Sequence, residues 1–273
     1  MATKSNNEMS FLEHLEALRW HLVRSIMSIM VFAIVAFVFK DIIFTNIIIA
    51  PKTPEFFTNR NLCAFGTWIG IKALCINAEP FQLININMAG QFTTHIMVSM
   101  IIGLILAFPY LVFEMWRFIG PALYDKEQKY ARGAVFYISL LFIMGVLFAY
   151  YVIIPLSVHF LGSYKVSEEV TNQINLMSYI STVSAISLAA GLIFELPVLI
   201  FFLTKIGLVT PEFLRKYRRH SFVIVLALSA IITPPDVFSQ ILVAFPLMFL
   251  YEVGIRLSKR IVLQEQMAAK QTN

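Results

Sequence analysis

The residues of this sequence that could do chemistry are a few acids in unusual places. Glu195 stands in the tetrapeptide Phe-Glu-Leu-Pro, inside an apolar run over residues 177–203 that holds no other charged residue. A charge at the centre of a membrane-spanning helix costs roughly 2 to 3 kcal/mol, so an acid kept there indicates a functional site. A buried, hydrogen-bonded structural acid is the alternative, and the sequence leaves both open.

Three more acids flank apolar segments. Glu13 and Glu16 are three residues apart and share one helical face, while leucines recur every three residues on another face. This spacing predicts an amphipathic helix at the membrane surface. Glu127 lies in the polar connection after the second apolar segment. Either these acids bind a basic ligand, or they are solvated helix ends that balance nearby Lys and Arg.

The motifs of the common enzyme classes are missing from the sequence. It has no Gly-x-x-x-x-Gly-Lys-Ser/Thr phosphate loop, no His-Glu-x-x-His and no Gly-x-Ser-x-Gly, and its five histidines lack metal-ligand spacing. We therefore expect no enzyme activity, metal or cofactor. Any work would be driven by a partner or by a transmembrane gradient.

The composition indicates an integral membrane protein. Of the 273 residues, 59% are hydrophobic and 14% are charged, and the mean hydropathy is +0.77; a soluble domain of this length could not cover so much apolar surface. The first residues carry acids instead of a basic start and an apolar core, so we expect no cleaved signal peptide. The fold class predicted is an all-α membrane protein.

The apolar segments predict six transmembrane helices, of which the last two are short. The region after residue 220 is interrupted at Thr233-Pro-Pro-Asp236, and basic residues flank it on both sides. Both flanks therefore favour the cytoplasm, which requires two short helices or a re-entrant hairpin. The predicted spans cover residues 20–39, 95–116, 134–158, 177–203, 221–233 and 237–254.

The distribution of positive charge predicts the orientation. On the six-span arrangement, 16 of the 21 Lys and Arg residues lie on the side of the two termini, so both termini are expected in the cytoplasm. We expect a single membrane domain over 1–273, with a cytoplasmic amphipathic helix over 1–19, an extracytoplasmic cap loop over 41–92 and a cytoplasmic tail over 255–273.

The cap loop contains the only two cysteines, Cys63 and Cys75. They lie on the side of the membrane where disulfides form. The sequence predicts either a cap disulfide or two buried thiols.

Four motifs together resemble the TatC family, the multispanning receptor subunit of the twin-arginine protein translocase. The resemblance covers nearly the whole chain. The motifs are Phe-Leu-Glu-His-Leu-x-x-Leu-Arg over 11–19, Trp-x-Phe-Ile-x-Pro-Ala-Leu-Tyr over 116–124 with Glu127, Phe-Glu-Leu-Pro over 194–197, and Thr-Pro-Pro-Asp-Val-Phe-Ser-Gln over 233–240. Each motif is short, but four in this order on the predicted topology are specific.

The resemblance implies a six-helix protein of the bacterial cytoplasmic (inner) membrane. Such a protein recognises signal peptides with paired arginines, assembles with the single-span proteins TatA and TatB in an oligomeric complex, and exports folded proteins using the proton-motive force. The signal-binding residues implied here are Glu13, Glu16, Arg19, Phe118 and Glu127. The family usually has paired acids before Leu-Arg, whereas this sequence has Glu16 followed by Ala17, so Glu16 or Glu13 is expected to take that role.

The remaining polar residues of the spans form a second predicted group. The resemblance implies partner-helix contacts at Thr233 and Gln240, while Asp236 either joins them or caps the last helix. Glu195 is expected to form part of a polar cavity, because Pro197 cannot donate a hydrogen bond to the carbonyl of residue 193. The alternative function is a proton-coupled secondary transporter that uses Glu195, although no repeated halves are evident.

Overall fold

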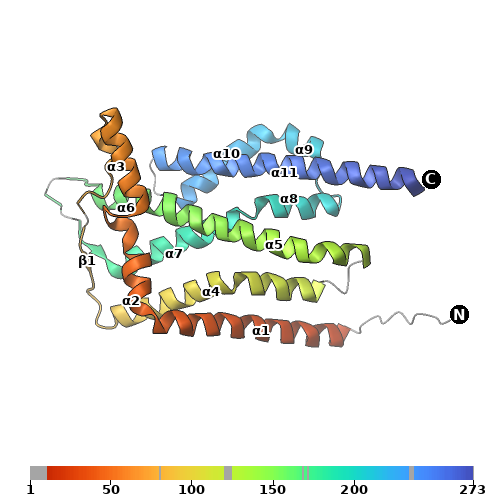
Figure 1. Cartoon of the computed structure of the whole chain (residues 1–273), viewed down its shortest axis with the longest axis horizontal. Helices are drawn as coiled ribbons and strands as arrows, with labels where there is room; N and C mark the ends of the chain where they lie inside the picture. The colour runs from red at the N-terminus through yellow and green to blue at the C-terminus, as the bar shows by residue number, and fades with distance from the viewer. Residues whose placement is uncertain are drawn as a thin grey trace. The chain divides into compact units, whose positions relative to one another are not determined.

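The computed structural model describes residues 11–79, 81–119, 125–167, 169–170, 172–233 and 237–272. Nearly all of the regular structure in these residues is helical (Figure 1). The chain forms two compact parts, which are described separately: a first part of residues 1–39 and 95–139, and a second part of residues 40–94 and 140–273.

Among the described residues, five helical segments are long and apolar enough to cross a membrane, which makes this a multi-pass membrane protein. α10 (Arg218–Ile232) has 15 residues, about 22 Å at 1.5 Å per residue, which is shorter than a bilayer core of about 30 Å. The sixth crossing therefore stays a prediction. The five segments are Leu15–Val38, Gly90–Phe118, Gly133–Ser163, Leu176–Lys205 and Gln240–Gln264.

The first part contains α1 (Phe11–Val38), most of α4 (Gly90–Ile119) and the start of α5 (Asp125–Phe148). α1 is one continuous helix because no Gly or Pro interrupts it. The surface helix and the first span, which the sequence analysis separated at residue 19, are thus a single element. α1 and α4 pack without an intervening side chain at Gly103, where a Cβ atom would lie 2.8 Å from the backbone nitrogen of Ala33.

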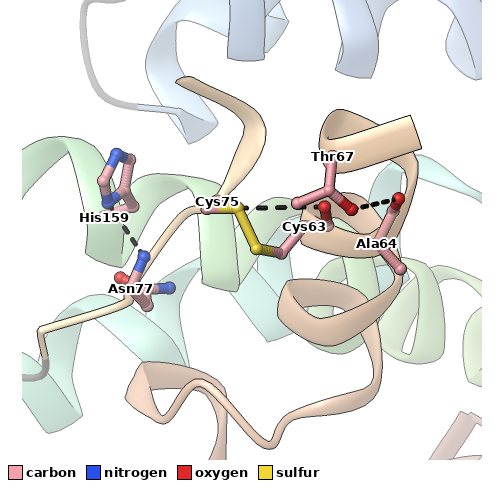
Figure 2. The surroundings of a disulfide bond; sticks show 6 residues. All are labelled: Cys63, Ala64, Thr67, Cys75, Asn77 and His159. Atoms are coloured by element: carbon pink, nitrogen blue, oxygen red, sulfur yellow. Dashed lines mark hydrogen bonds between the residues drawn. A yellow bond between two sulfur atoms is a disulfide. The ribbon is translucent and has the colours of Figure 1, made fainter. Parts of the chain in front are cut away.

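The second part begins with the segment between the first two spans, which is folded. Its elements are α2 (Lys40–Ile42), the π-helix η1 (Ile43–Ile48), the 3₁₀ helices η2 (Ala50–Lys52) and η3 (Lys72–Leu74), α3 (Phe57–Ile69) and the strand β1 (Leu83–Ile84). A disulfide joins Cys63 in α3 to Cys75 just after η3 (Figure 2). It closes a loop around the left-handed turn at Gly70.

Two buried asparagines hold this folded segment together. Asn59 donates a hydrogen bond of 2.9 Å from Nδ2 to the carbonyl of Pro51. Asn77 donates from Nδ2 to the carbonyl of Pro155 at 3.1 Å, and its backbone N–H donates to Nδ1 of His159 at 3.2 Å (Figure 2). These hydrogen bonds satisfy the buried amides and tie the segment to the third span, which contains Pro155 and His159.

The remaining elements form the rest of the spans. The third span continues through the π-helix η5 (Ala149–Ile153) into α6 (Ile154–Ser163). The strand β2 (Ile174–Asn175) pairs with β1 in parallel, which is a small departure from the all-α expectation. α7 (Leu176–Ile193), α8 (Leu196–Lys205), α9 (Pro211–Lys216), α10 and α11 (Val237–Thr272) follow. α11 is one helix that includes most of the expected tail.

Candidate functional site

A buried acid on α4 meets two partners in the first part of the chain. Glu114 is only 1% exposed. Its Oε2 contacts Nδ1 of His21 on α1, and its Oε1 accepts a hydrogen bond of 2.8 Å from the hydroxyl of Tyr110, one turn earlier on α4. Both carboxyl oxygens are therefore satisfied, which is what a buried acid requires.

His21 also links this acid to an aromatic residue of the predicted signal site. Its ring lies edge-on to that of Phe118, with centroids 5.8 Å apart. Glu114 and Phe118 are one turn apart on α4, so a single α1 side chain contacts both. The Phe118 side chain is half-buried and lies at the end of α4 that meets the beginning of α1.

The residues predicted to bind the signal belong to α1, α4 and α5 of the first part. Glu16 and Arg19 are exposed on α1, five and two residues before His21. Glu13 is the third residue of α1, and Glu127 is the third residue of α5, which begins six residues after the described end of α4. The side chains of Glu13 and Glu127 lie outside the described part of the structure.

The sequence analysis missed Glu114 and His21. A signal was present, because Glu114 is an acid inside an apolar segment and stands four residues after a tyrosine that can donate to it. The identity of its second partner was not visible, since His21 is 93 residues away.

The second part of the chain contains Glu195, at a break in the fourth span. α7 ends at Ile193 and α8 begins at Leu196, and the N–H of Glu195 bonds to the carbonyl of Leu192, three residues back, at 3.1 Å. This tightened turn follows from Pro197, which has no N–H to continue the helical pattern. The helix is therefore interrupted at Glu195, where the sequence predicted a carbonyl without a donor.

The Glu195 side chain is half-buried, yet both of its carboxyl oxygens are buried. They lie next to the backbone of Phe142 and make no hydrogen bond of ordinary geometry with the described residues. A buried polar group without a partner is costly, so this carboxyl favours water, a proton or a polar group of another molecule.

The polar residues on either side of the Pro-Pro-Asp sequence have internal partners. Thr233 is buried and donates from Oγ1 to the carbonyl of Ser229 at 2.7 Å. Gln240 donates from Nε2 to the carbonyl of Leu226 at 3.0 Å, which joins α11 to α10. Asp236 lies outside the described residues, so its two predicted roles both stay open.

Comparison with known proteins identifies the family. The family model described as Sec-independent protein translocase protein (TatC) matches residues 13–246. The TatC protein of Blattabacterium sp. subsp. Periplaneta americana is 39% identical over 92% of this chain and 96% of its own length. The TatCy protein of Bacillus subtilis is 32% identical over 93% of this chain and 90% of its own length.

Solved structures give the same result. Two crystal structures of a twin arginine translocase receptor, TatC, are 31% identical to this chain, with TM-scores of 0.63 and 0.66. Both match 90% of this chain, and the match covers 98% and 99% of the chains solved. The sequence motifs, the multi-pass helical fold and these matches together establish that the chain belongs to the TatC family of Sec-independent protein translocase proteins.

Proposed function

We propose that this protein is the receptor for twin-arginine signal peptides and a core subunit of a translocase that exports folded proteins, driven by the proton-motive force. The observation that carries the proposal is the contact of His21 with both Glu114 and Phe118. It fixes an aromatic side chain at the end of α4, close in the chain to the acids of α1 and α5. The two crystallised relatives, described as twin arginine translocase receptors, support it.

The chemistry of this end of the first part suits a pair of arginines. A guanidinium is bound best by a carboxylate that accepts two parallel hydrogen bonds. One exposed ion pair contributes only about 0 to 1 kcal/mol, so several acids must act together. Glu16 is exposed and available, and we assign Glu13 and Glu127 to the same site. Phe118 would pack against the apolar part of the signal.

We further propose six crossings with both termini in the cytoplasm and the disulfide-bonded segment outside. The excess of Lys and Arg near the termini supports this orientation. On this arrangement α10 is a short crossing, and Gln240 is half-buried beside it. The amide of Gln240 would contact a polar group on a TatA- or TatB-type helix, a contact worth about 1 kcal/mol.

The test is photo-cross-linking of a twin-arginine signal peptide to the full-length protein in membranes. Glu127→Ala should abolish or severely reduce the cross-link. Glu212→Ala, which removes an exposed acid from α9 in the second part, is the matched control and should cross-link normally. Undiminished cross-linking to the Glu127 variant would refute the assignment.

Two further experiments separate this function from its competitors. Ala17→Glu restores the second acid of the usual family pair and should leave export intact; a strong loss would mean that the motif is misaligned. Deletion of the gene should stop export of folded twin-arginine proteins while small-solute uptake continues. Loss of solute uptake with normal export would favour a proton-coupled transporter that uses Glu195.

A further inference from the structure

A basic cavity lies between α9, α10 and α11, and none of its lining residues belongs to the two sites described above. It has a volume of about 410 Å³ and is lined by Arg215, Arg218, Glu252, Ile255 and Arg256. Figure 1 shows α9 and α10 alongside α11. Three guanidiniums from three helices therefore converge on one space.

Three contacts hold α9 and α10 against α11. The hydroxyl of Tyr251 donates to the carbonyl of Leu214 at 2.9 Å, and both residues are buried. Gln240 bonds to Leu226, and Arg218 pairs with Glu252. Between the Gln240–Leu226 and Arg218–Glu252 contacts, the residue numbers increase along α11 while they decrease along α10, so the two helices are antiparallel. The start of α10 is thereby placed beside the middle of α11.

The charges in the cavity do not cancel. Nε of Arg218 lies 2.6 Å from Oε1 of Glu252, whose side chain is 29% exposed. Arg215 and Arg256 make no ion pair with any residue that the structure describes. Three arginines against one carboxylate give the lining a charge of about +2. The preference for positive charge on cytoplasmic loops explains basic residues here, but it does not require them to converge.

The base of the cavity is apolar, and its surroundings suit a lipid. Ile255 is buried in a cluster with Ile200, Leu214 and Tyr251. Large apolar side chains are exposed nearby on all three helices: Phe213, Phe222 and Phe249, at 51%, 47% and 62%. Phe222 is one turn from Arg218, and Phe249 is one turn before Glu252. A ligand with an anionic head and apolar chains matches this combination.

We propose that this cavity binds the phosphate of an anionic phospholipid at the membrane surface. Guanidiniums bind phosphate oxygens through paired hydrogen bonds, and basic pockets between transmembrane helices bind anionic head groups. Glu252 holds Arg218 in place, while Arg215 and Arg256 contact the phosphate. A lipid with two phosphates, such as diphosphatidylglycerol, complements the charge of the lining better than one with a single phosphate.

Native mass spectrometry of the full-length protein, purified in a neutral detergent and stripped of lipid, tests the proposal. Diphosphatidylglycerol should bind more tightly than phosphatidylglycerol, and phosphatidylcholine should not bind specifically. The double variant Arg215→Gln, Arg256→Gln should weaken binding of diphosphatidylglycerol about tenfold or more, as expected for the loss of charged hydrogen bonds. Equal binding of the three lipids would overturn the proposal.

The control is Arg219→Gln, which removes one charge from α10 at a position that does not line the cavity. It should leave lipid affinity within twofold, and an equal loss would mean that only general charge matters. Arg256→Lys retains the charge but loses the paired donors; it should weaken binding measurably even if the double variant does not fold. If millimolar inorganic phosphate displaced the lipid, the proposal that the bound phosphate belongs to a lipid would be wrong.

Discussion

Gly145 on α5 is a position at which a single methyl group should disturb the second part. A Cβ atom there would lie 2.7 Å from the carbonyl oxygen of Ala190, 2.9 Å from Cα of Gly191 and 2.9 Å from Cβ of Phe194. The first two of these atoms are backbone, and the third is fixed to it. They cannot rotate away, so Gly145→Ala must push α5 away from α7 just before the break at Glu195.

The size of the effect follows from these distances. Ordinary Cβ contacts lie at 3.4 to 4 Å, so the helices must separate locally by about 0.7 Å. A gap of that size forfeits roughly a quarter to a half of each van der Waals contact across it. Overpacking typically costs about 1 to 3 kcal/mol, against a gain of about 0.5 to 1 kcal/mol from replacing a helical glycine by alanine. We expect a net destabilisation of about 1 to 2 kcal/mol.

The measurement is thermal unfolding of the purified protein in detergent, monitored by loss of helical circular dichroism. Gly133→Ala is the matched control, since it lies on the same helix and a Cβ atom there would meet nothing within 4 Å. It should leave the melting temperature unchanged or raise it. Gly191→Ala should have a smaller effect than Gly145→Ala, because its closest contact is the ring of Phe142 and a ring can tilt. Equal melting of the Gly145 and Gly133 variants would refute the close-packing argument.

Three further predictions concern other parts of the structure. The disulfide between Cys63 and Cys75 closes a loop with a sequence separation of 12. Reduction or Cys63→Ser should therefore destabilise the folded segment by about 3 kcal/mol, which limited proteolysis would detect as faster cleavage. A mass shift upon alkylation without reductant would show that the bond is absent. His21→Ala removes one of the two partners of buried Glu114; it should lower the free energy of unfolding by about 1 to 3 kcal/mol and weaken signal cross-linking. Glu114→Gln should reduce both quantities less. Equal losses in the two variants would refute the idea that this contact positions Phe118. Glu195→Gln should retain export and Glu195→Leu should lose it, since only glutamine keeps a polar group at the helix break; loss in both variants would instead require an ionisable carboxyl there.

Local properties of the sequence were enough to predict the helices and the break. Apolar runs long enough to cross a bilayer core as helices predict the long spans. Pro197 interrupts the fourth span because proline has no backbone N–H, and this effect does not depend on the surroundings of the helix. The two cysteines on one predicted loop left a disulfide and two buried thiols as alternatives, and the structure has the disulfide. The predicted surface helix and the first span form one helix, α1, because no residue between Phe11 and Val38 ends it.

Only the tertiary structure decided which side chains meet. Glu114 is visible in the sequence as an acid in an apolar segment, but its contact with His21 depends on how α1 and α4 are rotated and aligned. Arg215 and Arg256 are 41 residues apart and come together because α10 runs back along α11. Hydropathy and proline determine helices and their breaks through residues that are neighbours in the sequence. The contacts between helices depend instead on helix register, which close packing such as that at Gly145 sets and which no local pattern encodes.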